Sequence, residues 1–155
     1  MKERPDNPGV RFPPPFLYAA AVIGGVLLDR GWALPIGGER SREMAAAAFG
    51  ASFLVLIATS IGRFWLARTT MLPMRPASTM VISGPYQFTR NPMYLGLALL
   101  TAAFALFFNT WWIAILLVPA VFLMNRLVIA REEAYLRRRF GAEYEAYCRK
   151  VRRWI

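Results

Sequence analysis

Four long apolar runs, separated by short basic segments, are the feature of this 155-residue chain that most restricts its fold. The runs cover residues 16–28, 44–66, 93–108 and 111–130, and 57% of the chain is hydrophobic. A helix needs about 20 mainly apolar residues to cross the hydrocarbon core of a bilayer, and basic segments between such runs are typical of polytopic membrane proteins. The sequence therefore predicts an all-α integral membrane protein, with four transmembrane helices in a single membrane domain over residues 1–155.

The basic residues are distributed unevenly between the two sides that four spans would create. Of the 19 Lys and Arg residues, three lie before the first run, four between Arg63 and Arg90, and nine from Arg126 onward. The other side has only Arg30, Arg40 and Arg42. Because short cytoplasmic segments carry the excess of positive charge, both termini are expected in the cytoplasm, and the expected location is a bacterial or archaeal plasma membrane.

The net charge of +10 is also a property of nucleic-acid-binding proteins. Those proteins concentrate Lys and Arg on one face of a basic domain, whereas here the basic residues flank apolar runs and are better placed to contact anionic lipid. No nucleic-acid partner is therefore expected. The basic C-terminal segment has apolar residues at spacings of three and four, which predicts an amphipathic helix that binds anionic lipid, with a break near Gly141. Its apolar stripe consists of Leu136, Phe140, Tyr144, Tyr147, Val151 and Ile155.

The chain contains no histidine and a single cysteine, Cys148. A Ser-His-Asp or Cys-His mechanism is therefore excluded for one chain, and no intrachain disulfide can form. No metal site is expected, because zinc is held mainly by His and Cys. Cys148 is expected to be an inert part of the amphipathic helix.

The segment Gly84–Gly96, GPYQFTRNPMYLG, leads from a loop into the third apolar run. It contains two turn signals, Gly-Pro and Asn-Pro, and Pro92 suits the first turn of a helix. A loop that enters a helix N-terminus offers free backbone N–H groups, and Arg90 could add a bidentate clamp for a carboxylate or phosphate. The alternative is an interfacial loop with aromatic anchors, in which Arg90 faces lipid.

Two adjacent acids, Glu132 and Glu133, follow directly after the fourth apolar run. A carboxylate at a membrane face is energetically unfavourable unless a positive charge pairs with it or it has a functional role. One interpretation is a solvated helix end that pairs with Arg131, Arg137 or Arg138 at helical spacings. The other is a carboxylate that holds a cationic amine or acts as a base. The predicted topology places both the acids and the segment Gly84–Gly96 on the cytoplasmic face, where they could meet.

In this order, GPYQFTRNPMYLG, a helical hairpin and REEAYLRRRFGAEYEAYCRKVRRWI resemble the isoprenylcysteine carboxyl methyltransferases and related phospholipid N-methyltransferases. These integral-membrane enzymes use S-adenosyl-L-methionine, and the resemblance extends from about Pro76 to the C-terminus. It implies a cofactor pocket between the first segment and the two acids, closed from the cytosol by the C-terminal segment. Asn91 departs from the pattern, since the family often has histidine there, and asparagine forms hydrogen bonds but cannot act as a base.

The resemblance also implies roles for individual residues. Arg90 and Glu133 are the expected catalytic residues. Phe140, Gly141, Tyr144 and Tyr147 match the family's tail pattern. The expected cofactor-binding residues are Gly84, Pro85, Tyr86, Asn91, Pro92, Tyr94, Gly96, Glu132 and Glu133.

The function expected from this resemblance is methyl transfer from S-adenosyl-L-methionine to a carboxylate or amine of a lipid-like or prenylated acceptor, which would enter from the bilayer. A membrane reductase of related architecture is one alternative, with NADPH as cofactor and a sterol-like or polyprenyl substrate. A membrane scaffold without enzymatic activity, whose basic tail holds anionic lipid, is another. The sequence leaves open whether a carboxylate or an amine is methylated.

Overall fold

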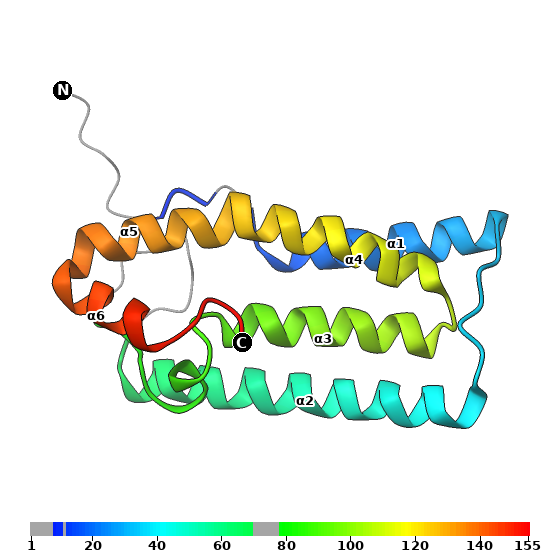
Figure 1. The fold of residues 1–155 in the computed structure, drawn as a ribbon, viewed down its shortest axis with the longest axis horizontal. Coiled ribbons are helices and arrows are strands. Elements are labelled where there is room, and N and C mark those ends of the chain that lie inside the picture. Colours follow the sequence, from blue (N-terminus) through cyan, green and yellow to red (C-terminus); the bar gives the residue numbers. More distant parts are fainter. Residues whose placement is uncertain (1–7, 11, 70–77) are drawn as a thin grey trace.

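The computed structural model describes residues 8–10, 12–69 and 78–155, and within these ranges it is helical and contains no strand. Four helices lie side by side along the longest dimension of the molecule (Figure 1). They are α1 (Pro15–Gly31), α2 (Glu39–Leu66), α3 (Pro92–Phe107) and α4 (Trp111–Met124). α1 packs against α4, α2 packs against α3, and α3 also contacts α1 and α4. The prediction that the apolar runs form the helices of an all-α bundle is confirmed.

The fourth run belongs to a longer helix than the sequence predicts. α4 continues through a π-helical segment, η2 (Asn125–Ile129), into α5 (Ala130–Phe140). The expected span at residues 111–130 therefore ends inside a continuous helix. Apolarity marks the part of a helix that contacts lipid or core, whereas the charged residues of α5 extend the same helix beyond it. Glu132 and Glu133 lie in the first turn of α5 and not at a helix end.

Two helices are long and apolar enough to cross a membrane, judged by length and composition. They are α2 and the continuous helix Trp111–Phe140. α3 is apolar but has 16 residues, and α1 has 17. Because each residue adds about 1.5 Å to a helix, α3 is shorter than the hydrocarbon core of about 30 Å. The described residues thus contain two candidate spans, where the sequence predicts four.

A tight hairpin joins α3 to α4 at one end of the bundle (Figure 1). Asn109 has a left-handed backbone, with φ at 55°, and its side-chain oxygen accepts hydrogen bonds from the backbone N–H groups of Ile36 (3.1 Å) and Gly37 (3.0 Å). The N–H of Trp111 donates to the carbonyl of Leu34 (2.9 Å). The hairpin therefore holds the loop between α1 and α2, which ties the two helix pairs together at this end.

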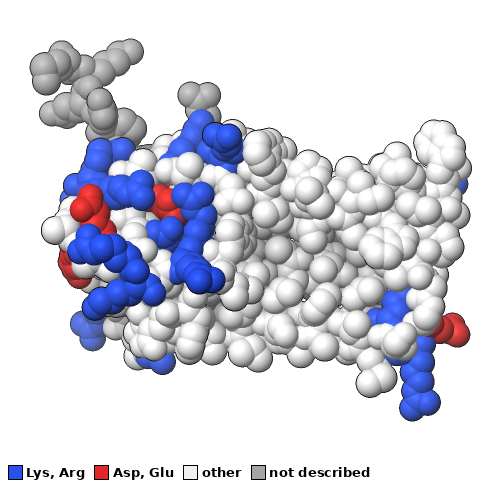
Figure 2. All heavy atoms as spheres, in the orientation of Figure 1, with Lys and Arg blue, Asp and Glu red and all other residues white. Residues whose placement is uncertain are grey.

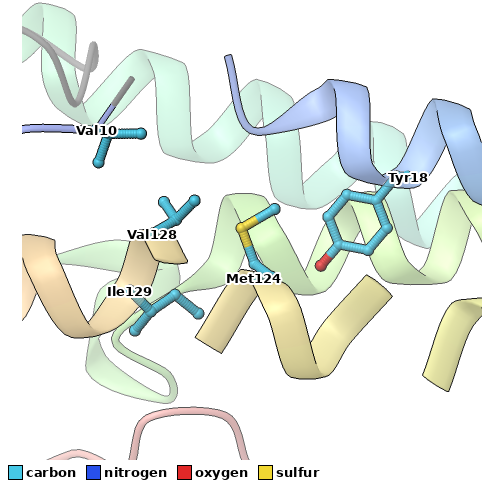
Figure 3. Packing of buried hydrophobic residues seen from close by; sticks show 5 residues of the cluster. All are labelled: Val10, Tyr18, Met124, Val128 and Ile129. Carbon is cyan, nitrogen blue, oxygen red and sulfur yellow. The ribbon is translucent and has the colours of Figure 1, made fainter. Parts of the chain in front are cut away.

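Small residues allow α1 to approach α4 closely. A Cβ atom added to Gly25 would lie 2.7 Å from the backbone nitrogen of Ile113 and 2.8 Å from its Cα atom. Glycine at a helix contact allows such an approach between two backbones. Nearer the other end of the same helix pair, a buried cluster joins the two helices to the segment before α1 (Figure 3). It consists of Val10, Tyr18, Met124, Val128 and Ile129.

Charge is concentrated at the end of the bundle formed by α5 and by the last helix, α6 (Ala142–Lys150). Figure 2 shows Lys and Arg side chains gathered there around a few acids, while the middle of the visible face carries no charge. A smaller group of charged side chains lies at the opposite end. An uncharged belt between two charged ends is the surface that a bilayer-embedded bundle requires.

Candidate active site

The loop before α3 contains a short 3-10 helix, η1 (Gly84–Gln87), that packs on α2. Gly84 has a φ of +64°, and a Cβ atom at this position would lie 2.6 Å from the Nε of Arg63. Glycine is favoured here because an L side chain rarely adopts this conformation. The buried ring of Tyr86 packs edge-on against Phe64, with ring centroids 5.7 Å apart. These contacts fix the first segment of the site on the end of α2.

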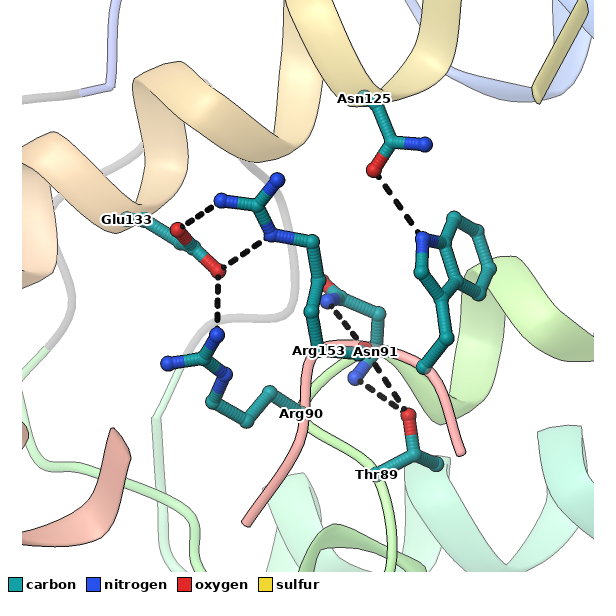
Figure 4. Close-up of polar contacts among 7 residues, drawn as sticks. Thr89, Arg90, Asn91, Asn125, Glu133 and Arg153 are labelled. Carbon is teal, nitrogen blue, oxygen red and sulfur yellow. Dashed lines mark hydrogen bonds and ion pairs between the residues drawn. The ribbon is translucent and has the colours of Figure 1, made fainter. Parts of the chain in front are cut away.

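Glu133 is buried at the centre of an arginine cluster (Figure 4). One of its oxygens accepts from the Nε of Arg153 at 3.0 Å, and the other accepts from the Nη2 of the same side chain at 2.6 Å. Arg90 approaches the first oxygen at 3.2 Å. Two guanidinium groups, one from the loop and one from the C-terminal segment, therefore neutralise a single buried carboxylate. A buried carboxylate is stable in a low-dielectric site only when opposite charge and hydrogen bonds compensate it, and both guanidinium groups do so here.

Glu132, the neighbouring acid, faces a different partner. Its carboxylate accepts a hydrogen bond from the hydroxyl of Tyr94 at 2.5 Å. The hydroxyl of Tyr18, from α1, donates to the backbone carbonyl of Tyr94 at 3.2 Å. The two adjacent acids thus point into two different environments, one cationic and one phenolic. Glu132 connects α5 to α3 and, through the backbone of Tyr94, to α1.

The segment after α6 (residues 151–155) lies across the loop before α3 and forms, together with α6, the C-terminal tail. The N–H of Arg90 donates to the carbonyl of Arg152 at 2.9 Å, and residues 89 and 152 form an isolated parallel bridge. The side chains of Thr89 and Asn91 both donate to the carbonyl of Arg153, at 3.1 and 2.8 Å. Asn91 therefore acts here as a hydrogen-bond donor to the tail, a role that does not require a group able to act as a base.

The tail is also attached to the π-helical segment and to η1. The indole N–H of Trp154 donates to the side-chain oxygen of Asn125 at 3.1 Å. The hydroxyl of Tyr147 donates to the backbone carbonyl of Tyr86 at 2.6 Å. A break between α5 and α6 at Gly141, where φ is +51°, brings Tyr147 to this position and confirms the predicted interruption of the amphipathic helix. The C-terminal residues therefore cover the junction of the two sequence segments.

The protonation of the tail follows from these contacts. Hydrogen bonds to Glu133 raise the pKa of the Arg153 guanidinium, which stays cationic. Burial raises the pKa of the Tyr147 hydroxyl, which is therefore a neutral donor at physiological pH. The tail thus contributes a cationic guanidinium from Arg153 and a neutral hydroxyl donor from Tyr147 to the site.

Residues 43–143 match the family model of the phospholipid methyltransferases. This range is well over half of the chain, begins in α2, and contains both Gly84–Gly96 and the two acids. The chain belongs to the phospholipid methyltransferase family. At the level of the family, this is a membrane methyltransferase that acts on lipid substrates, and the resemblance seen in the sequence is confirmed at that level.

A short relative of this phospholipid methyltransferase comes from Haemophilus influenzae and is described as an uncharacterized protein. It is 40% identical over 65 residues, which is 41% of this chain and the whole of that protein. No solved structure matches the chain.

The structure of this family member brings most of the expected site residues into one cluster. Tyr86, Arg90, Asn91, Tyr94, Glu132 and Glu133 converge from η1, the following loop, α3 and α5. Pro92 is buried in the first turn of α3, as its position in the sequence predicts. Gly84 and Pro85 form the turn of η1. Gly96 is turned away from this cluster, because it packs against Phe53 and Leu56 of α2.

Arg153 is the site residue that sequence reasoning missed. It lies 20 residues after Glu133, among several other basic residues of the tail. Nothing in its spacing separates it from its neighbours Arg149, Lys150 and Arg152. Only the return of the chain after α6 brings it to the carboxylate.

Proposed function

We propose that this protein transfers a methyl group from S-adenosyl-L-methionine to a carboxylate or amine of a lipid-like acceptor. The observation that carries the proposal is the pair of adjacent acids in two environments, within the range matched to a methyltransferase family. Glu133 is held between Arg90 and Arg153, while Glu132 is held by the hydroxyl of Tyr94. One acid thus positions a guanidinium, and the other offers a negative charge.

The residues of the cluster fit the amino-acid portion of this cofactor. Arg90 is mostly buried, and its Nε has no hydrogen-bond partner within the described part of the chain. A buried donor without a partner is unfavourable, and a ligand carboxylate would satisfy it. Glu132 would face the ligand ammonium. No metal is needed for this arrangement, and no group of three or more His, Cys, Asp or Glu residues is placed to hold one among the described residues.

Each residue then has a defined task. The cofactor supplies an activated methyl group on its sulfonium, so that the protein mainly has to bind and orient the two reactants. Arg90 binds the carboxylate, Glu132 binds the ammonium, and Glu133 holds Arg90 in position. The tail, fixed by Arg153 and Trp154, excludes water. Methylation of an amine releases one proton and methylation of a carboxylate releases none, so proton release during turnover distinguishes the two acceptor classes.

We also propose an orientation of the four helices in the membrane and a contact with anionic lipid. Four spans, with α1 and α3 tilted little in a locally thin bilayer, would place the charged end formed by α5 and α6 in the cytoplasm. The charge asymmetry supports this orientation, and the same end would contact anionic lipid through its exposed Lys and Arg side chains (Figure 2). The cofactor would then enter from the cytosol and the acceptor from the bilayer.

Replacement of Glu132 with glutamine is expected to weaken binding of S-adenosylhomocysteine roughly 10- to 100-fold, because a charged hydrogen bond to the ligand ammonium is lost. Glutamine keeps the shape and can still accept from Tyr94. The measurement is calorimetric titration of the detergent-purified protein. Glu145→Gln, an exposed residue of α6, is the matched control and should bind like the wild type. A folded wild type that binds NADPH but not S-adenosylhomocysteine would refute the proposed function.

A further inference from the structure

Arg126 is an exposed charged residue on the long helix that runs from Trp111 to Phe140. Its backbone lies about 22 Å beyond Trp111 along the helix axis, since each residue adds about 1.5 Å. Tryptophan residues gather at the boundary of a bilayer, and the hydrocarbon core is about 30 Å thick. In the orientation proposed above, the backbone of Arg126 therefore lies inside the hydrocarbon, below the cytoplasmic boundary.

The side chain of Arg126 points toward the middle of the membrane and not toward the cytosol. Its guanidinium carbon lies 5.5 Å from the centroid of the Phe122 ring, which is one turn closer to Trp111. Helical side chains lean toward the helix N-terminus, and here this direction leads away from the cytoplasmic head groups. A guanidinium at this depth is unfavourable without an anion, and a cation–π contact contributes only about 0.5–2 kcal/mol.

The described part of the chain supplies no carboxylate to Arg126. The ion pairs found there belong to Glu133, and Glu132, the next acid along the helix, faces the hydroxyl of Tyr94 in the interior. The residues three and four positions away from Arg126 are all uncharged: Phe122, Leu123, Ile129 and Ala130. The compensating anion therefore has to come from another molecule.

The surface around Arg126 fits a phospholipid that lies along the helix. On the side toward Trp111, an apolar stripe of Ile115, Val118 and Phe122 is 46–70% exposed and is suited to an acyl chain. On the cytoplasmic side, Ala130 is exposed and small, so that it leaves space for a head group beside the guanidinium. The stripe and the charge thus match the two parts of one lipid molecule.

We propose that Arg126 binds the phosphate of one anionic phospholipid of the cytoplasmic leaflet, whose acyl chain lies on Ile115, Val118 and Phe122. Arginine pairs with phosphate oxygens through its planar fork of N–H donors, and the Phe122 ring holds the guanidinium in place. A lipid with net negative charge is favoured over a zwitterionic lipid, because the guanidinium repels an ammonium group.

This lipid is distinct from the methyl acceptor, because Arg126 is exposed whereas Glu133 is buried on the inner side of the helix. The inference rests on the membrane orientation proposed above and is independent of methyl transfer. The site also differs from the basic cluster at the end of α5. Arg138 lies about 18 Å beyond Arg126 along the axis, outside the hydrocarbon, where water and salt screen its charge.

The test compares binding of dioleoylphosphatidylglycerol and dioleoylphosphatidylcholine to the full-length, detergent-purified protein by native mass spectrometry. Arg126→Gln removes the charge and keeps a polar side chain of similar length. Arg138→Gln is the matched control, since it removes one exposed arginine from the same continuous helix. Phe122→Leu is a second variant of the site, which keeps an apolar side chain and removes the ring. The melting temperature of each protein is measured with and without the anionic lipid.

The wild type is expected to retain one phosphatidylglycerol in preference to phosphatidylcholine. Arg126→Gln should weaken this binding about ten-fold, because a charge-assisted pair with the phosphate is lost, and Phe122→Leu should weaken it less. Phosphatidylglycerol should raise the melting temperature of the wild type and of Arg138→Gln, but not that of Arg126→Gln. The melting temperatures without lipid should be the same.

Equal retention of phosphatidylglycerol by the wild type and Arg126→Gln would overturn the inference. An equal loss in Arg138→Gln would also overturn it, because binding would then follow total charge and not one site. If Arg126→Gln instead dissociates a dimer that forms without added lipid, the anion comes from a second copy of the chain and the lipid proposal is wrong. Binding of S-adenosylhomocysteine should be unchanged in both variants, and its absence in the wild type would refute the methyltransferase function alone.

Discussion

Replacing Glu133 with glutamine is expected to lower the free energy of unfolding by about 3 kcal/mol or more, the typical cost of removing one partner from a buried ion pair. Glu133 is 4% exposed. Without its charge, the Arg90 guanidinium, on a side chain that is 13% exposed, would remain in the bundle as an uncompensated positive charge. The same change should abolish methyl transfer, because Arg90 would no longer be held in position for a ligand.

Chemical denaturation of the detergent-solubilised variant measures this loss, together with its methyl-transfer rate. Glu145→Gln, on the exposed face of α6, should stay within about 0.5 kcal/mol of the wild type. Arg153→Ala should cost less than Glu133→Gln, because the Arg153 side chain is 40% exposed and Arg90 still compensates the carboxylate. A stability loss for Glu133→Gln no larger than that of the control would mean that solvent screens this cluster.

Replacing Gly25 with alanine is expected to destabilise the bundle by about 1–3 kcal/mol, the usual cost of overpacking a close contact. The added methyl group would meet the backbone of Ile113 at 2.7–2.8 Å. A backbone in the middle of a helix pair cannot move aside as a side chain can, so α1 has to separate from α4. Because Tyr18 of α1 is bonded to the backbone of Tyr94, the separation should also weaken S-adenosylhomocysteine binding.

Gly24→Ala is the matched control for this prediction. Its methyl group would lie 3.1 Å from the Cδ1 of Leu116, the flexible end of a side chain. Alanine is also favoured over glycine in a helix by roughly 1 kcal/mol, so Gly24→Ala should leave thermal stability unchanged or raise it. Equal melting temperatures for the two variants would contradict the close backbone contact between α1 and α4.

The helices of the bundle could be predicted from the sequence because apolar runs and turn residues mark them directly. The run at residues 93–108 corresponds to α3 within one residue at each end, since Pro92 and the hairpin at Asn109 define both limits. α2 begins at Glu39, five residues before the apolar run, because a charged segment continues the same helix outside the apolar part. Apolarity therefore predicts the middle of these helices better than their ends.

The candidate site could be predicted only where its residues lie in local motifs. Arg90, Tyr94, Glu132 and Glu133 belong to two short segments whose composition is unusual beside an apolar run. Arg153 reaches the site through a chain reversal after α6. This chain reversal is not visible in residue spacing.

The π-helical segment Asn125–Ile129 determines the direction in which the side chains of Glu132 and Glu133 point around the helix axis. A π turn holds one residue more than an α turn, so every later side chain is rotated by about 100° relative to an uninterrupted α-helix. In an uninterrupted helix, Glu132 would take the direction that Glu133 now has, and Arg131 would take the direction of Glu132. Tyr94 would then face a guanidinium, and no carboxylate would remain beside its hydroxyl between α3 and α5. A single additional residue, a full turn before the acids, therefore determines which charge faces the interior.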